Sequence, residues 1–432
     1  MSHTVDARPF FCCLSLLVFL ILAAGPTHAQ DEEFSFDFQD FSKSPWTLDG
    51  YLQGSLDYLA LNRESQFYRL AFLDKEEDAH LFQGGAELQM GLTFQDGPIT
   101  FFGLGKLEQA HDGTDWDSSA LLYEGRVSWQ INPNAFVTGG KSLSRWGTGY
   151  AWNPTNFVGR DKNPSDPDLA LEGHWLGQVD FVKSFDGALR NMAFTGIVLP
   201  VTDDINSGFG TSDQVNAAAK LYLLFHNTDI DLMALSSGSK SPRYGLTLSR
   251  NLTANFEIHG EAALFRDYAK AIVERDGAVT ARIDDVGSYL AGIRYLAPTN
   301  TTFIFEYYHN GRGYTASEAE DLFAHIIDLD EQQLASIRSL LASYQVPNFM
   351  RNYLYLKASQ KEPFGWLYLT PSLYSIVNTD DGSFNLIPEA VYTGVENLEI
   401  RARMSLLVGG SGTEYGEKIN DWKLEFRGRY FF

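Results

Sequence analysis

The sequence has little cysteine and, beyond its N-terminus, no long apolar segment. Its two cysteines, Cys12 and Cys13, lie in an apolar run, residues 10–24, that follows Arg8 and precedes a small-residue cleavage site at residues 27–29. These features are typical of a secretory signal peptide, so we predict that residues 1–29 are one. The rest of the chain can then form no disulfide and no thiolate metal site. No later apolar run approaches the ~18 residues of a membrane-spanning helix, which excludes a helical membrane protein.

Positive charge and catalytic signatures are scarce as well. The formal net charge is −22, which argues against nucleic acid as a partner, because binding phosphates requires a basic surface. The nine histidines are scattered, and the G-x-S-x-G, H-E-x-x-H and C-x-x-C motifs do not occur. We therefore predict no enzyme activity, no metal site and no cofactor. The surplus of acidic residues fits solvated loops first, and sites for divalent cations second.

Aromatic residues and glycine are abundant, and they follow a strict alternation that is clearest in the last stretch, residues 422–432. The apolar positions are Trp422, Leu424, Phe426, Gly428, Tyr430 and Phe432, and the polar ones are Lys423, Glu425, Arg427 and Arg429. A period of two places these sets on opposite faces of a strand. A broad aromatic face fits a lipid-facing wall around a polar lumen, whereas the alternative is the edge strand of a sandwich. The terminal Phe432 resembles the signal that bacterial outer-membrane assembly machinery reads.

The same alternation recurs in residues 46–58 and 86–94, so the first and last strands can pair and close a barrel. Between the predicted strands, eight tight turns alternate with nine mostly longer polar links, one of which is expected near residues 269–284. Bacterial outer-membrane barrels alternate short periplasmic turns and longer outer loops in this way. The count gives eighteen strands, with sixteen as the alternative.

The chain therefore divides into a signal peptide (1–29), a periplasmic leader (30–45) and a barrel (46–432). Residues 316–344 break the strand pattern, because apolar side chains such as Leu322 and Ile326 recur there at helical spacing. We expect one or two short amphipathic helices in this link, about residues 315–346, over the mouth of the barrel. The predicted fold class is an all-β transmembrane antiparallel β-barrel with a short helical insert in one extracellular loop.

Charged side chains at inward positions are the first set of candidate functional residues, because the inner wall of a wide barrel decides what passes. They are Glu87, Glu124, Arg126, Glu257, Glu261, Arg294, Lys357, Arg401, Arg403, Lys423, Arg427 and Arg429. Two interpretations stay open: the charges neutralise one another, or they create a transverse field across a water-filled lumen. Residues 257–261 place Glu257, His259 and Glu261 on one face, where we expect a hydrogen-bonded cluster rather than a metal site.

The third long link, about residues 145–173, is the second candidate. Its distinctive residues are Arg145, Trp146, Gly147, Gly149, Trp152, Asn153, Asp161, Asp166, Asp168 and Glu172. Glycines between aromatics allow a tight backbone path, and prolines stiffen it. The link is either a constriction loop folded into the lumen or, with Trp175, part of the aromatic belt at the outer interface.

Two motifs resemble those of a group of largely uncharacterised, porin-like bacterial outer-membrane proteins. The first is W-G-x-G-x-x-W-N-P at residues 146–154, followed by D-K-N-P-x-D-P at 161–167, and the second is Y-H-N-G-x-G-Y at 308–314. The resemblance covers the chain from about Lys141 onward. It implies the barrel fold and the outer membrane, but no substrate.

Together these observations predict an outer-membrane channel or facilitator for a small hydrophilic or amphipathic solute. A different class of function stays open: a non-conducting structural or accessory component of an envelope export or lipid-trafficking assembly. The expected partners are outer-membrane lipid and lipopolysaccharide, the assembly machinery and the small solute. The sequence leaves open whether copies of the chain form a homo-oligomer.

Overall fold

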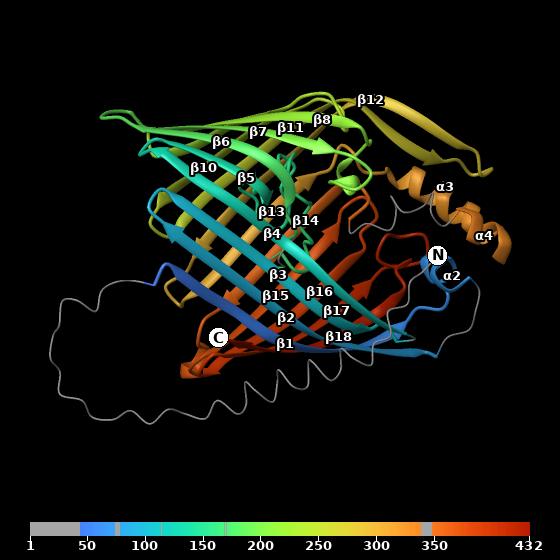
Figure 1. The fold of residues 1–432 in the computed structure, drawn as a ribbon. Coiled ribbons are helices and arrows are strands. Elements are labelled where there is room, and N and C mark those ends of the chain that lie inside the picture. Colours follow the sequence, from blue (N-terminus) through green and yellow to red (C-terminus); the bar gives the residue numbers. More distant parts are fainter. Residues whose placement is uncertain (1–43, 74–77, 114, 168, 170, 338–347) are drawn as a thin grey trace. The chain divides into compact units, whose positions relative to one another are not determined.

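The computed structural model describes residues 44–73, 78–113, 115–167, 169, 171–337 and 348–432. The predicted signal peptide and nearly all of the predicted leader lie outside the described residues. Residues 46–432 form one unit, a closed antiparallel barrel of eighteen strands (Figure 1). The predicted fold class and the larger strand number are therefore confirmed.

The strands follow one another around the barrel in sequence order, and each pairs with its neighbours in the chain. The first half comprises β1 (Trp46–Leu61), β2 (His80–Asp96), β3 (Ile99–His111), β4 (Trp116–Asn132), β5 (Ala135–Ser142), β6 (His174–Ser184), β7 (Leu189–Val201), β8 (Gln214–Phe225) and β9 (Thr228–Leu235). The second half comprises β10 (Arg243–Thr253), β11 (Phe256–Val273), β12 (Val279–Leu296), β13 (Thr301–His309), β14 (Asn352–Gln360), β15 (Leu369–Asn378), β16 (Phe384–Val395), β17 (Leu398–Val408) and β18 (Asn420–Phe431). β1 pairs with β18 and closes the barrel, with Gly54 opposite Gly428.

The two faces of the wall differ in chemistry, as the alternation predicts. On β18, Phe426 is half exposed on the outside, whereas its neighbour Glu425 is buried inside. The exterior is a wide apolar surface to which many strands contribute large exposed side chains, among them Leu48, Phe82, Trp129, Val198, Leu232 and Phe303. Such a band suits the hydrocarbon core of a membrane, because the closed ladder leaves no unpaired strand edge in it.

The links differ in length between the two ends of the barrel. Two to eight residues connect strands at one end, here the short-turn end, and most of the long links lie at the other, the long-loop end. The predicted polar link near 269–284 is wrong in extent, since β11 and β12 continue to Val273 and from Val279. Polar residues such as Lys270 and Arg282 pair across this extended ladder, so the strands continue past the point at which the apolar alternation ends.

Helices cover part of the long-loop end. The predicted insert contains α3 (Ala316–Ile327) and α4 (Glu331–Ile337), and its remainder, residues 338–347, lies outside the described residues. A capping box between Thr315 and Glu318 begins α3. The first long link contains an unpredicted helix, α2 (Gln66–Phe72), whose Phe67 packs edge-on against Phe323 of α3. Two short 3₁₀ turns complete the described elements, η2 (Ser207–Phe209) and η4 (Pro363–Gly365).

Among the described residues, no helix has the length and apolar character needed to cross a membrane.

Candidate functional site

The link between β5 and β6, residues 143–173, crosses the interior of the barrel. It leaves the wall at β5 and returns at β6, and between these points it contacts β11, β13, β17 and β18. These strands lie five or more places around the wall from β5 and β6, so the link spans the lumen. We call residues 143–173 the inner loop.

Glu261 on β11 holds the first half of the inner loop. Its Oε1 accepts hydrogen bonds from the backbone N–H groups of Thr148 at 2.6 Å and Gly149 at 2.7 Å. Its Oε2 accepts two more from Thr155, through the hydroxyl at 2.7 Å and the backbone N–H at 3.2 Å. The side chain of Asn153 adds a fifth, at 3.0 Å. Only 4% of Glu261 is exposed, so this buried carboxylate is surrounded by donors that stabilise its charge.

Glu306 on β13 holds the next two residues in the same manner. Its Oε1 accepts from the N–H of Tyr150 at 2.5 Å, and its Oε2 accepts from the N–H of Ala151 at 2.9 Å. Nε2 of His259 lies 2.9 Å from Oε1, and Glu306 is fully buried. Residues 257–261 thus take part in a hydrogen-bonded cluster that also includes a carboxylate from another strand. Among the described residues, no group of three or more His, Cys, Asp or Glu could hold a metal ion.

Two glycines let the backbone approach these carboxylates. Gly147 has φ +97°, and a Cβ there would lie 2.7 Å from Oε1 of Glu261. A Cβ on Gly149 would lie 2.1 Å from the backbone oxygen of Trp152. A side chain at position 147 would therefore push the loop away from Glu261, and one at position 149 would disrupt the turn that the loop makes to Trp152.

Aromatic side chains of the inner loop are buried within the barrel. Trp152 stacks on Tyr308 with ring centroids 5.2 Å apart, and Trp146 packs edge-on against Phe157. Trp175 instead lies on β6, where 41% of the residue is exposed on the outer surface. The aromatic-belt interpretation therefore fits Trp175 and not the other two tryptophans.

The second half of the inner loop binds the opposite, basic wall. The carboxylate of Asp166 lies 3.4 Å from Arg401, 3.5 Å from Arg403 and 3.4 Å from Arg427. Arg403 also donates to the carbonyl oxygen of Ser165 at 3.0 Å. The basic wall and the acidic residue of the loop are thus in direct contact.

Carboxylates of the wall complete this network. Glu425 accepts from Arg403 at 2.8 Å and from Arg427 at 3.0 Å, and Arg401 has Glu389 and Glu399 within 4 Å. Most of the basic charge on β17 and β18 is therefore compensated locally.

The remaining candidates of the inner loop lie near its ends. Glu172 pairs with Lys141 of β5 and with Arg160, which fixes the return of the loop to the wall. Asp161 lies 4.0 Å from Arg312. Arg145 is exposed toward the lumen, and Asp168 lies outside the described residues.

The other lumen candidates form separate pairs along the wall. Their partners along the wall include Lys106 for Glu87, Arg126 for Glu124, Arg294 for Glu257, Asp57 for Lys423, Gln53 for Arg429 and the ring of Tyr374 for Lys357. They do not meet at one site. Local neutralisation describes most of these pairs, and the inner loop is where the charged groups of distant strands come together.

Cavities lie on both sides of the inner loop. One of about 480 Å³ adjoins the wall of β4–β8 and is lined mainly by polar side chains, such as Arg126, Asp180 and Lys220. Another of about 480 Å³ adjoins β13 and β14 and is lined by Tyr150, Tyr355 and Lys357 among others. Arg145 lines both cavities, so it lies where the inner loop divides the lumen.

A closed barrel of this strand number with a polar interior resembles the porins, whose 16–18 strands enclose an aqueous channel. The barrel is porin-like in fold. No family model matches the sequence, and no curated protein matches it. Among solved structures, OccAB1 of Acinetobacter baumannii is similar over 89% of this chain and 96% of that chain, at 12% identity and a TM-score of 0.53. A triple mutant of the Rhodopseudomonas blastica porin covers 90% of this chain and all of its own, at 12% identity and a TM-score of 0.43. At such identities the likeness concerns the fold alone.

Sequence reasoning missed one central residue of this site, Glu306. Its neighbours Phe303 and Phe305 are exposed on the outer face of β13, so the alternation places Glu306 inside. An acidic residue at an inward position was the available signal. That signal could not have shown that Glu306 binds the backbone of a link 155 residues away.

Proposed function

We propose that the protein is a channel of the bacterial outer membrane, through which a small hydrophilic or amphipathic solute passes beside the inner loop. The observation that carries this proposal is the anchoring of that loop across the lumen by Glu261 and Glu306. Because its backbone N–H groups donate to buried carboxylates, the inner loop is held in one conformation. A constriction of fixed conformation can select solutes by size and charge.

The polar cavities beside the inner loop support passage. Their lining groups include cations, carboxylates and hydroxyls from several strands, which suits hydrated solutes rather than a sealed apolar core. The outer-membrane location is supported by the apolar exterior of the barrel and by the aromatic outward face of β18, which we propose the assembly machinery reads.

The packing at the long-loop end favours the second candidate, a non-conducting accessory role. Phe67, Leu70, Leu322, Ile326 and Phe349 form a buried cluster with the inner-loop residue Trp152 and with Tyr415 of the last long link. A cluster of this size covers part of the mouth, and complete coverage would leave no path.

Conductance separates the two candidates. We expect the purified full-length protein to give ion currents in a planar lipid bilayer. Arg145→Glu should shift the reversal potential in a salt gradient toward cation preference, because Arg145 lines both cavities. The matched control is Arg190→Glu, at the short-turn end of β7, which should leave the reversal potential unchanged.

Two outcomes would count against the channel. A correctly folded protein that carries no current would favour the accessory role. Currents that respond equally to both substitutions would show that the path does not run beside Arg145.

A further inference from the structure

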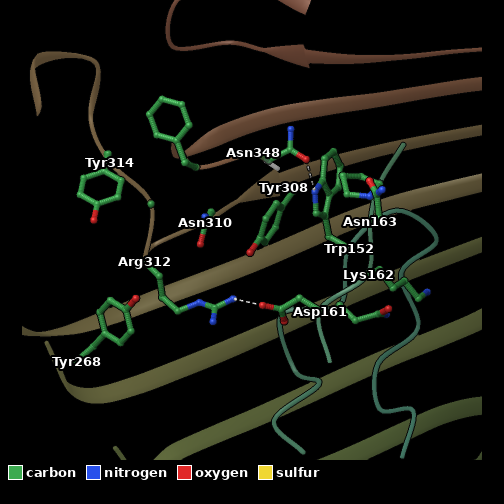
Figure 2. A pocket seen from close by; sticks show the side chains of 14 residues that line it. Trp152, Asp161, Lys162, Asn163, Tyr268, Tyr308, Asn310, Arg312, Tyr314 and Asn348 are labelled. Carbon is green, nitrogen blue, oxygen red and sulfur yellow. Dashed lines mark hydrogen bonds and ion pairs between the residues drawn. The ribbon is translucent and has the colours of Figure 1, made fainter. Parts of the chain in front are cut away.

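A third cavity, of about 400 Å³, lies between the inner loop and the long link after β13 (Figure 2). Its walls come from the inner loop, from β11 and β13, and from the long link after β13. Neither of the anchoring carboxylates, Glu261 and Glu306, lines it. Its volume is within the range of pockets that hold small ligands.

Two of the residues that line this cavity each have a buried polar atom without a hydrogen-bond partner in the described part of the chain. One is a donor, Nε of Arg312, and the other is an acceptor, Oδ1 of Asn310. The amide nitrogen of Asn310 is engaged by the carbonyl oxygen of Met350 at 3.3 Å, which leaves its oxygen as the available group. A buried polar atom without a partner costs free energy, so such a pair points to a molecule that supplies the missing bonds.

The carboxylate of Asp161 is a second acceptor at the same place. It lies 4.0 Å from Nη2 of Arg312, beyond hydrogen-bond distance, and 75% of its side chain is exposed. Figure 2 shows Arg312 and Asp161 facing each other across the cavity. A ligand group between them would bind both. The other cation of the lining, Lys162, donates instead to the carbonyl oxygens of Gly149 and Tyr150.

Aromatic rings form a large part of the lining, from Trp152, Tyr268, Tyr308, Tyr314 and Phe349. The faces of such rings carry partial negative charge, and they attract the weakly positive C–H groups of a saturated ring as well as apolar surface. The cavity thus combines flat apolar walls with one donor and two acceptors.

We infer that this cavity binds a neutral polyhydroxylated ring, of the size of a monosaccharide or disaccharide. The inference rests on the proposed channel function, for which the cavity is an outer binding site in front of the constriction. A hydroxyl both donates and accepts, so adjacent hydroxyls can accept from Arg312 while donating to Asn310 and Asp161. The C–H face of the ring then lies on the aromatic wall.

A simple carboxylate is the competing ligand, since Arg312 is a cation and Arg243 lies on the same aromatic ring, that of Phe265. A carboxylate has no donor for Oδ1 of Asn310, and the exposed carboxylate of Asp161 would repel it. The polyhydroxylated ring satisfies all three groups.

The test is a titration of the full-length protein followed by intrinsic tryptophan fluorescence, because Trp152 lines the cavity. The detergent must not be a glycoside, since a sugar headgroup would compete. The probes are glucose, galactose, maltose and sucrose, with adipate as a carboxylate that lacks hydroxyls. We expect at least one sugar to bind saturably and adipate not to bind.

The side chains are tested by Arg312→Gln and, independently, by Asn310→Leu. Loss of a bond to a charged group should weaken sugar binding about tenfold to a hundredfold for Arg312→Gln, and loss of a neutral bond by about three- to tenfold for Asn310→Leu. Arg429→Gln is the matched control, because it removes the same charge from the lumen wall, where Arg429 binds Gln53. It should leave sugar binding unchanged, and unaltered heat-modifiable migration would show that each variant is folded.

The inference is overturned if no sugar binds, if adipate binds in an Arg312-dependent way instead, or if neither cavity variant weakens binding more than the control. Planar-bilayer conductance is measured on the same samples. A protein that binds sugar without conducting would refute the proposed channel and retain the site. A protein that conducts without binding sugar would refute the site and retain the channel.

Discussion

The acidic wall of β11 and β13 and the basic wall of β17 and β18 hold the same loop in opposite ways. Glu261 and Glu306 accept from backbone N–H groups of residues 148–155. The basic wall instead binds one side chain, Asp166, and one carbonyl oxygen, that of Ser165. Both contacts are buried and charged, but only one of them depends mainly on a side chain of the loop.

Because of this difference, we expect the two walls to control different properties of the passage: the acidic wall its shape, and the basic wall its charge. Backbone N–H groups are present whatever side chains the loop carries, so the acidic wall sets the path of residues 148–155 as long as glycine is kept at 147 and 149. The basic wall needs an acid at position 166. We therefore expect changes on the acidic wall to alter the size of the passage, and changes on the basic wall to alter its charge.

The largest expected effect comes from removing both anchoring carboxylates. In Glu261→Gln with Glu306→Gln, several buried N–H groups lose a charged acceptor, which should destabilise the protein by roughly 3–5 kcal/mol and release the loop. Single-channel conductance should rise at the same time. Conductance steps in bilayers and thermal unfolding in detergent measure the two effects.

Glu257→Gln is the matched control for this pair. Glu257 lies on the same wall, but its contact with the inner loop is a 3.4 Å hydrogen bond from the hydroxyl of Tyr150 and involves no backbone N–H. If the control raises conductance as much as the double variant, the anchoring carboxylates do not hold the constriction.

An intermediate effect is expected on the basic wall. Asp166→Asn leaves three arginines with less compensation, so ion preference should shift toward anions with little change in conductance. Arg401→Gln with Arg403→Gln should shift it toward cations. Reversal potentials across a salt gradient measure both shifts, which should shrink at 1 M salt, where screening acts over about 3 Å.

The control for charge alone is Asp186→Asn, in a turn at the short-turn end. Equal shifts from Asp186→Asn and Asp166→Asn would contradict the assignment of selectivity to the basic wall. A large rise in conductance from Asp166→Asn would show that this wall, too, sets the size of the passage.

The last expected effect is on stability and not on ion passage, and it concerns pH and a residue outside both walls, Lys240 in the link between β9 and β10. Burial, and then repulsion by Arg243, lower the pKa of Lys240 to about 7, although Asp161 opposes the shift. An unfolded lysine has a pKa of about 10.4, so between about pH 7 and pH 10 the unfolded chain binds more protons than the folded one. The contribution of Lys240 to the free energy of unfolding should therefore rise with pH across this window and level off below it.

Denaturant unfolding from pH 6 to pH 10 measures this slope, and Lys240→Met should reduce it. The charged or titratable groups that act on Lys240 are Arg160, His174, Arg243, Arg312 and Asp161. An unchanged slope in Lys240→Met would assign the pH dependence to these neighbours.

Much of the barrel could be predicted, because a strand in a membrane wall obeys a local rule. Alternation in residues 422–432 placed Glu425 inside and Phe426 outside, and the turns between the strands were visible as short polar breaks. The alternation failed as a guide where neither face of a strand needs to be apolar. Lys270 and Arg282 continue the β11–β12 ladder with polar residues, so alternation could not show where those strands end.

The sequence by itself determined the fold class and the side of the wall on which most residues lie, because each depends on a period of two within about ten residues. For the number of strands, the turns and links favoured eighteen and left sixteen open. Only the tertiary structure decided which residues meet inside. Glu306 joins the backbone of Ala151, Asp166 joins Arg401 and Arg427, and Asn310 and Arg312 border one cavity with Trp152. These contacts join parts of the chain that lie far apart in sequence. They depend on the closure of the barrel and on the path of the loop across it, and no local pattern encodes either.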